Sequence, residues 1–190
     1  MILFADACAR VNSRSRELAE AVLSQLSIGD HDVERVNLYE QDLKPLTEAV
    51  IQMRDEALKR SDFSDPYFDL AKQFSRADTI VMAAPYWDMS FPAVLKLYIE
   101  NISVCGITFR YEENGMPHGL CRAYKLYYVT TAGGEIGSYN FGYDYIKALS
   151  LGLYGVKDAS CIRVVGLDMD TVDADSVMEN AKKHIAKMRD

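Results

Sequence analysis

The sequence predicts an α/β fold, with a parallel, doubly wound sheet of five strands and helices on both faces. Short apolar runs of strand length and longer amphipathic segments alternate about five times along the chain. One run, residues 78–85, is apolar almost throughout, which is typical of a central parallel strand. The 190 residues contain no internal repeat, low-complexity segment or linker. We therefore expect a single domain over residues 1–190.

The first part of the chain predicts two strands with a helix between them. Residues 1–7 form an apolar run of strand length, and residues 32–38 alternate between apolar and polar side chains. Apolar residues recur at helical spacing over residues 15–26, and Ser13 or Ser15 can cap the start of this helix.

The strand at residues 78–85 is preceded by two predicted helices and followed by one. Amphipathic patterns predict helices over residues 47–60 and 65–77, before the strand, and over residues 91–103, after it. Pro66 stands at the start of the second helix, where its missing N–H is no disadvantage.

The last part of the chain predicts a hairpin-like excursion and a return to alternating strands and helices. The turn residues Glu113, Asn114 and Gly115 predict that residues 106–120 form the excursion. The same apolar and helical patterns then predict a strand at 123–132, a helix at 141–154, a strand at 159–167 and a helix at 173–188.

Charge and cysteine content narrow the possible partners. The net charge of −7 argues against nucleic acid and against an anionic membrane surface, because both need a basic face. The chain has four cysteines, at positions 8, 105, 121 and 161, and three histidines, at positions 31, 118 and 184. They form no CxxC pair and no zinc-ligand spacing, so we expect no metal and a reducing, cytoplasmic compartment. We expect neither a signal peptide nor a membrane span.

Ligands of an open parallel sheet bind beyond the carboxyl ends of its strands, where the strand order reverses. Three loops of this sequence follow predicted strands in that way, at residues 7–15, 85–90 and 131–139. We therefore expect a ligand site where these three loops meet.

The first loop has the composition of a phosphate site. It carries Arg10, Asn12, Ser13, Arg14 and Ser15 directly before a helix. Hydroxyl groups, backbone N–H groups and the positive end of the helix favour a phosphate, and arginine adds charge-assisted donors. The alternative is an ordinary helix cap on a solvated turn.

The other two loops have the composition of a site for a flat ring. Tyr86 and Trp87, the chain's single tryptophan, follow Pro85 at a strand-to-helix turn, where a planar cofactor could stack on them. The paired glycines Gly133 and Gly134 allow a close backbone approach. The alternatives are packing of the two aromatic residues against a partner subunit or a lid, and an ordinary glycine turn.

Together the three loops predict a mononucleotide with its phosphate at the first loop and its ring between the other two. The dinucleotide fingerprint GxGxxG is absent, and flavin mononucleotide (FMN) suits a flavodoxin-like strand order better than a Rossmann order.

Four segments resemble the flavodoxin-fold, FMN-dependent NAD(P)H oxidoreductases of the azoreductase and quinone reductase group. Ser13-Arg14-Ser15 matches their Ser-x-Ser phosphate loop, and residues 85–102, "PYWDMSFPAVLKLYIENI", are similar to their Pro-Met-Tyr-Asn-Phe stretch and the helix after it. Residues 106–120, "GITFRYEENGMPHGL", resemble their Gly-x-Thr-Phe element, and "TTAGG" stands where they have Ser-Arg-Gly-Gly. The resemblance runs in register from Ala7 to about Gly166.

This resemblance implies a homodimer with FMN near the subunit interface and ping-pong transfer from NADH or NADPH to a quinone, azo or similar aromatic acceptor. It implies that Ser13, Arg14 and Ser15 hold the FMN phosphate. It also implies that the flavin ring is lined by Tyr86, Trp87, Asp88 and Met89 on one side and by Thr131, Ala132, Gly133 and Gly134 on the other.

The chain departs from the group at two positions, where Asp88 replaces asparagine and Ala132 replaces arginine. An acid near the ring would disfavour a negatively charged reduced flavin, so redox potential and acceptor choice are affected more than flavin binding.

No side chain is nominated as catalytic, because the flavin would carry out the hydride chemistry. His118 lies in the excursion, and we expect it on the solvated surface. Tyr139 and Tyr143 follow the double glycine, where they could reach an acceptor or serve packing.

Two rival functions remain open from the sequence. Residues 8–15, "CARVNSRS", fit the C-x5-R-[ST] phosphate loop of low-molecular-weight, cysteine-dependent phosphatases, with Cys8 as nucleophile and Arg14 as phosphate ligand. Asp65-Pro66 imitates their general-acid loop but comes too early in the chain, and the loop has no glycine. The second rival is a flavodoxin-like electron carrier without enzymatic activity.

Overall fold

Five parallel strands form the central sheet of the computed structural model, which describes residues 1–27 and 32–188. In chain order the strands are β1 (Ile2–Asp6), β2 (Val33–Asn37), β3 (Thr79–Ala83), β6 (Lys125–Thr131) and β7 (Asp158–Val164). They lie in the order β2-β1-β3-β6-β7, and all four adjacent pairs are parallel. The predicted sheet is therefore confirmed. His31 lies outside the described residues.

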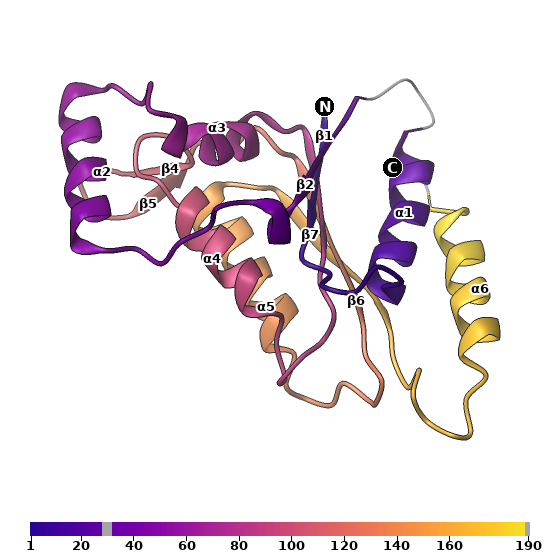
Figure 1. Cartoon of the computed structure of the whole chain (residues 1–190). Coiled ribbons are helices and arrows are strands. Elements are labelled where there is room, and N and C mark those ends of the chain that lie inside the picture. The colour runs from indigo at the N-terminus through magenta and orange to yellow at the C-terminus, as the bar shows by residue number, and fades with distance from the viewer. Residues whose placement is uncertain (28–31, 189–190) are drawn as a thin grey trace.

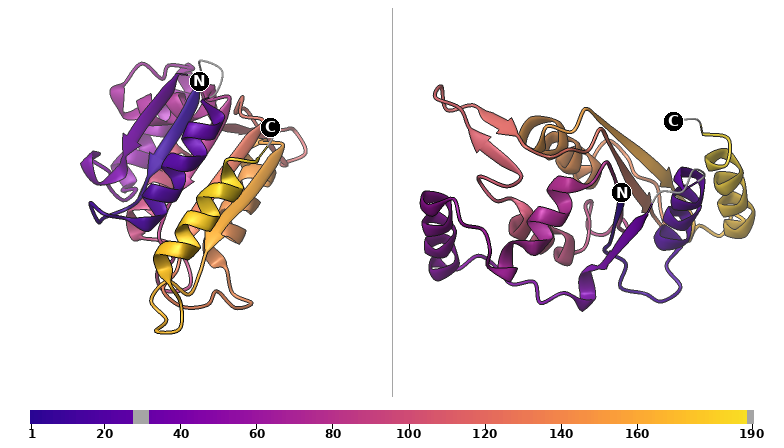
Figure 2. Two further views of the ribbon diagram at one scale, coloured as in Figure 1. Left: turned by 90° about the vertical axis from the view of Figure 1, so that its right-hand side faces the viewer. Right: turned by 90° about the horizontal axis from the view of Figure 1, so that it is seen from above.

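Helices cover both faces of the sheet (Figures 1 and 2). One face carries α1 (Arg14–Leu26) and α6 (Ala174–Ile185). The other face carries α3 (Asp69–Arg76), α4 (Ala93–Ile102) and α5 (Phe141–Leu149). Each predicted helix is present, although 3-10 turns at Leu38–Glu40 and Pro66–Phe68 precede α2 and α3, and a π segment at Ser150–Tyr154 continues α5.

The sheet separates two apolar cores because successive strand residues point to opposite faces. Leu3 and Ala5 of β1 pack on the side of α3, α4 and α5, whereas Ile2 and Phe4 pack on the side of α1 and α6. All five residues of β1 are buried, as the apolar run predicts for a strand covered on both faces.

Helix α2 (Glu48–Arg60) stands away from the sheet, as Figure 1 shows, and Ala57 is its one buried residue. Arg54 connects it to the rest of the molecule by donating hydrogen bonds to the carbonyl oxygens of Ser103, Glu100 and Asn101, at 3.2, 2.9 and 3.2 Å. The carbonyl groups at the end of α4 are thus satisfied by the arginine of another helix.

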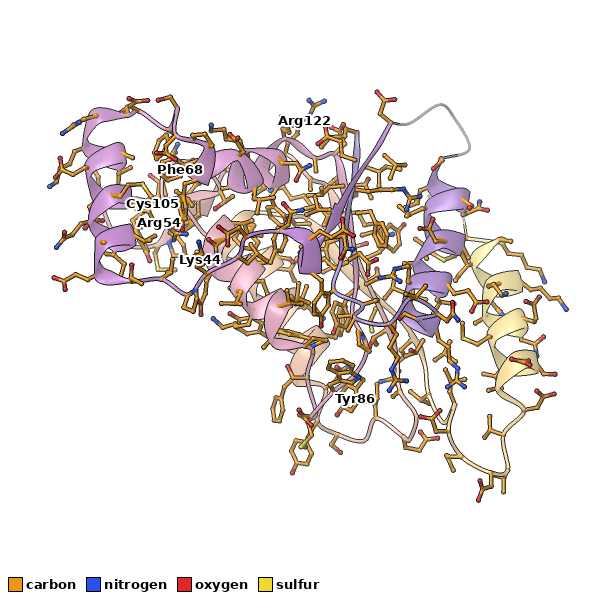
Figure 3. The ribbon with its side chains drawn as sticks, viewed as in Figure 1. Lys44, Arg54, Phe68, Tyr86, Cys105 and Arg122 are labelled. Atoms are coloured by element: carbon orange, nitrogen blue, oxygen red, sulfur yellow. The ribbon has the colours of Figure 1, made fainter. Side chains whose placement is uncertain are left out.

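The predicted excursion is an antiparallel hairpin of β4 (Phe109–Tyr111) and β5 (Pro117–Gly119). Gly115 takes a φ of +78° at its turn, a conformation that glycine adopts without strain. The hairpin lies between the end of α4 and the start of β6, and so at the amino ends of the strands. In Figure 3, Arg122 and Tyr86 mark opposite edges of the sheet.

No helix among the described residues is both long and apolar enough to cross a membrane. The four cysteines are free thiols.

Candidate functional site

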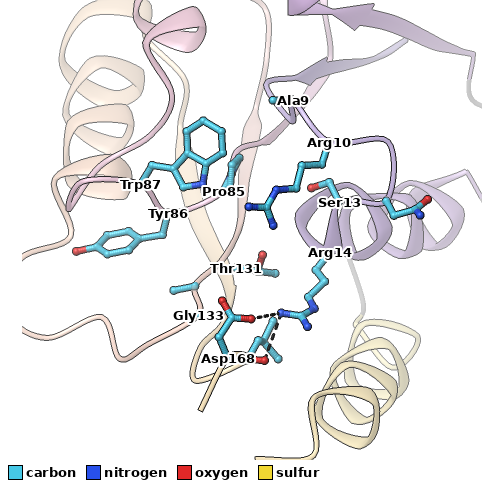
Figure 4. Close-up of a pocket in the computed structure, with 13 residues that line it drawn as sticks. Ala9, Arg10, Ser13, Arg14, Pro85, Tyr86, Trp87, Thr131, Gly133 and Asp168 are labelled. Atoms are coloured by element: carbon cyan, nitrogen blue, oxygen red, sulfur yellow. Dashed lines mark hydrogen bonds and ion pairs between the residues drawn. The ribbon is translucent and has the colours of Figure 1, made fainter. Parts of the chain in front are cut away.

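A pocket of about 350 Å³ opens at the carboxyl edge of the sheet, over the ends of β1, β3 and β6 (Figure 4). The three loops predicted to meet there all contribute to its wall, together with the loop that follows β7. The lining residues are Ala9, Arg10, Asn12, Ser13, Arg14, Pro85, Tyr86, Trp87, Thr131, Ala132, Gly133, Leu167 and Asp168. The order of the strands thus brings loops distant in sequence into one site.

The first loop ends at the amino terminus of α1. Ser13 is the N-cap, and its hydroxyl accepts a hydrogen bond from the backbone N–H of Arg16 at 3.4 Å. The amides of the first helical turn are left without an intrahelical acceptor, as at every helix start, and the helix dipole adds positive potential there. Arg10 and Arg14 line the same end of the pocket and add positive charge, that of Arg14 being paired with the carboxylate of Asp168. This end of the pocket is therefore suited to an anion.

Arg16 binds the backbone of the first loop and does not line the pocket. The sequence interpretation did not single it out. Its Nε donates to the buried carboxylate of Asp6. Its Nη1 donates to the carbonyl oxygens of Arg10 at 2.8 Å and Val11 at 2.9 Å, and its Nη2 to that of Cys8 at 2.7 Å. Burial alone would lower the pKa of Arg16, but the bond to Asp6 raises it above the usual value. The guanidinium therefore stays charged.

Asp168 is a second residue that the sequence interpretation missed. Its Oδ1 accepts a hydrogen bond from Arg14 Nη1 at 2.7 Å, and the same nitrogen lies 3.3 Å from the carbonyl oxygen of Leu167 (Figure 4). The pair is exposed to solvent and contributes little to stability. The sequence did contain a signal for this residue. Asp168 stands in a loop that directly follows a predicted strand, as the other three loops of the site do.

The second loop is a tight turn. Trp87 and Ser90 exchange backbone hydrogen bonds of 3.2 and 2.8 Å, and the residues between them, Asp88 and Met89, have φ values of +51° and +65°. This backbone favours Asn-Gly, so Asp-Met is strained there. Tyr86 is tied to the third loop, since its N–H donates to Thr131 O at 3.0 Å and its hydroxyl to Tyr139 O at 2.7 Å.

The third loop lies against both the first loop and the loop after β7. The hydroxyls of Ser15 and Thr131 are 2.8 Å apart beneath the pocket. The amide of Asp168 donates to the carbonyl oxygen of Gly133 at 2.9 Å. A Cβ on Gly133 would lie 2.2 Å from Asp168 Oδ2, so a larger residue there would displace that carboxylate.

The pocket wall includes nine of the thirteen residues that the sequence nominated for the cofactor: Arg10, Ser13, Arg14, Pro85, Tyr86, Trp87, Thr131, Ala132 and Gly133. The other four lie outside it. Ser15 is fully buried, and its hydroxyl is paired with that of Thr131. Asp88, Met89 and Gly134 are exposed beside the pocket.

The structure argues against Cys8 as a nucleophile. Its side chain is 2% exposed and absent from the pocket wall, and the thiol lies 3.7 Å from the carbonyl oxygen of Ala83. Burial raises the pKa of Cys8 to about 12, so the thiolate that a phosphatase needs is scarce at neutral pH. Asp65 caps the turn before α3, where its carboxylate accepts the N–H of Tyr67 at 2.8 Å.

The remaining candidates have structural partners. His118 is on the hairpin strand β5, with Nδ1 at 3.3 Å from Glu112 Oε1. The Tyr143 hydroxyl donates to Ala159 O at 2.6 Å, and its ring stacks on Tyr128, so it serves packing. Tyr139 is exposed. No group of three or more histidine, cysteine or carboxylate side chains that could hold a metal occurs among the residues with described positions.

Comparison with known proteins gives a match over almost the whole chain. The family model described as having a flavodoxin-like fold matches residues 1–188. The chain belongs to this family. The strand order and the position of the pocket agree with that membership.

Two curated relatives of the chain share one name. The chain is 32% identical over 182 residues to the "FMN-dependent NADH:quinone oxidoreductase" of Lachnoclostridium phytofermentans, covering 86% of this chain and 89% of that protein. It is 30% identical to the protein of the same name from Clostridium beijerinckii, covering 95% of this chain and 93% of that protein.

Solved structures agree in fold. Azoreductase AzrA superposes with a TM-score of 0.81 at 25% identity, covering 98% of this chain and 99% of that one. An azoreductase from Bacillus anthracis superposes with a TM-score of 0.84 at 24% identity, covering 98% of this chain and 96% of that one.

Proposed function

We propose that this protein is an FMN-dependent NADH:quinone oxidoreductase that also accepts azo or similar aromatic compounds. The observation that carries the proposal is the pocket, where the three predicted ligand loops meet at the reversal of strand order. The curated relatives are FMN-dependent NADH:quinone oxidoreductases by name, and the solved neighbours include azoreductases.

The residues of the pocket fit FMN in their chemistry. Arg10, Arg14 and Ser13, together with the start of α1, offer charged and polar donors to a phosphate. Trp87 is 40% exposed, an unusual position for a large aromatic side chain unless it contacts a ligand or a partner. Gly133 lines the pocket, and its missing side chain makes room for the Asp168 carboxylate.

The chain's own residues bind and orient the cofactor and its substrates. FMN, when bound, supplies the hydride chemistry between a nicotinamide and an acceptor. Ser13 and Arg14 would hold the phosphate, with Ser15 buried beneath them against Thr131. Pro85, Tyr86 and Trp87 would bound one side of the ring. Thr131, Ala132 and Gly133 would bound the other, with Asp88, Met89 and Gly134 at the margin. No side chain is required as an acid or base.

Steady-state kinetics test this function. Purified protein with FMN is expected to consume NADH continuously when a quinone is present, with parallel double-reciprocal lines typical of ping-pong transfer. NADPH serves as the comparison reductant. A protein that binds FMN but consumes NADH for only one turnover would be an electron carrier. Hydrolysis of an aryl phosphate that Cys8→Ser abolishes would support the phosphatase instead.

We also infer a homodimer in the cytoplasm. Trp87 in the pocket wall and Met89, Tyr139 and Phe141 beside the pocket are each at least 40% exposed, and exposed apolar side chains of this kind are typical of interfaces. Four free thiols support a reducing compartment. Sedimentation equilibrium is expected to give a mass of twice the 21.4 kDa chain for wild type. The Phe141→Glu variant is expected to give the mass of a single chain. A monomeric wild type would contradict the dimer but not the activity.

A further inference from the structure

Arg16 lies behind the first loop and does not line the pocket. Its side chain is 25% exposed, and that of its carboxylate partner Asp6 is 9% exposed. Asp6 also fixes the other side of the loop, since its Oδ1 accepts the N–H of Cys8 at 2.9 Å. One buried carboxylate thus anchors both the loop and the arginine that grips it.

The grip is made almost wholly to backbone carbonyl groups. The guanidinium donates to the carbonyl oxygens of Cys8, Arg10 and Val11, and residues 9–12 of this loop are exposed. A planar guanidinium can satisfy several acceptors at once from a fixed fork of donors. Three carbonyl groups of a four-residue stretch therefore point toward the same side chain.

That arrangement dictates where the neighbouring amides point. In a planar trans peptide, the C=O of one residue and the N–H of the next point in opposite directions. Carbonyl groups directed at Arg16 therefore turn the N–H groups of Ala9, Val11 and Asn12 away from it. Within the described part of the chain, none of these three amides donates a hydrogen bond. Neighbouring free amides that face the same way can form a concave anion site.

We propose that Arg16 is a positioning residue that orients the amides of residues 9, 11 and 12 toward the phosphate of a bound flavin, and so sets the preference for FMN over riboflavin. The inference rests on the proposed function. Arg10 and Arg14 supply charge on the pocket side, whereas Arg16 supplies loop geometry from the far side. The flavin ring is expected to contact the other two loops, so its binding should depend little on Arg16.

The experiment compares FMN with riboflavin, which lacks the phosphate, in wild type and Arg16→Lys. Lysine keeps the charge but cannot reach three carbonyl groups and a carboxylate together. The matched control is Arg35→Lys. Arg35 on β2 forms a bidentate surface ion pair with Glu20, which lies on α1 as Arg16 does. Dissociation constants come from quenching of flavin fluorescence at constant salt.

Arg16→Lys is expected to reduce the ratio of riboflavin to FMN dissociation constants about tenfold or more, as the loss of hydrogen bonds to a charged group implies. The riboflavin constant should stay within about twofold of wild type, and Arg35→Lys should leave both constants unchanged. An unchanged ratio in folded Arg16→Lys, or an equal loss for both flavins, would overturn the inference while leaving the proposed function intact. A wild type that binds neither flavin would overturn both.

Asp6→Asn provides a second variant if Arg16→Lys does not fold. Asparagine preserves the shape and an acceptor for the Cys8 amide, but removes the charge that anchors Arg16. The same selective loss of FMN affinity is expected, and riboflavin binding that falls in parallel would contradict the inference.

Discussion

The two edges of the sheet are treated differently by the chain. At the amino edge, Arg54 satisfies the carbonyl groups that end α4, and the hairpin packs so closely that a Cβ on Gly119 would lie 2.1 Å from the backbone of Tyr154 and Gly155. At the carboxyl edge, the amides of Arg14 and Ser15 that begin α1 have no hydrogen-bond acceptor among the described residues, and four loops leave a pocket of about 350 Å³.

The two edges therefore differ in whether their polar groups are paired within the chain. Arginine closes a helix end at one edge, whereas at the other edge Arg16 turns carbonyl groups inward and leaves amides free. An edge filled by the chain itself serves stability, and an edge left open serves binding. Each of the following variants is expected to affect one of these properties without the other.

Cys8 tests whether the open edge ends at the apolar core. Its pKa of about 12, raised from 9.0 chiefly by burial, lowers the thiolate fraction about 1,000-fold at pH 8. Iodoacetamide at pH 8, followed by mass spectrometry, should leave Cys8 unmodified in native protein and modify it in urea. Because the folded pKa is the higher one, this thiol's stabilising contribution is complete below pH 9 and is lost as the pH rises toward 12. Labelling of native Cys8 at the unfolded rate would place it in the pocket.

Gly119→Ala tests the closed edge. The new methyl group would meet backbone atoms that cannot move aside, and we expect a loss of about 3 kcal/mol in the free energy of unfolding, within the usual range for overpacking. Gly152→Ala is the control, since a Cβ there meets nothing within 4 Å. Urea unfolding measures both variants. Unchanged stability of Gly119→Ala would show that the hairpin is loosely attached.

Ser13→Asp tests the phosphate end of the open edge. Aspartate caps helices as well as serine does, so stability should be retained. Its charge would face the phosphate and weaken FMN binding by about 3 kcal/mol, or about 100-fold. Ser13→Asn, a neutral cap, should bind FMN nearly as wild type does. Flavin fluorescence titration gives both constants, and equal affinities in the two variants would move the phosphate away from Ser13.

The turn at residues 87–90 gives the smallest effect. Asn and Gly adopt positive φ values with less strain than Asp88 and Met89 do. Replacing both residues in this way is therefore expected to raise the free energy of unfolding by about 1 kcal/mol. Met116→Gly, at a position without positive φ, should bring no gain. A destabilised double variant in urea would mean that the turn is not strained.

The sequence predicted the parts of the molecule that depend on local pattern. Apolar runs located the five strands, turn residues located the hairpin, and the rule about strand ends brought Arg10, Tyr86 and Gly133 to one pocket. Asp168 and Arg16 were not predicted, because their roles depend on tertiary contacts with Arg14 and Asp6 that the local pattern does not show. The strained turn escaped because Asp88 and Met89 carry no glycine signal for positive φ.

The central claim is that three loops at the carboxyl edge grip FMN together, and Trp87, the single tryptophan, stands on one of them. Titrating the protein with FMN while recording tryptophan fluorescence tests it most directly. We expect saturable quenching with one FMN per chain in wild type, and its loss at the same FMN concentrations in Ser13→Asp. Protein that takes up no FMN, or binds it while Trp87 fluorescence stays unchanged, would contradict the account.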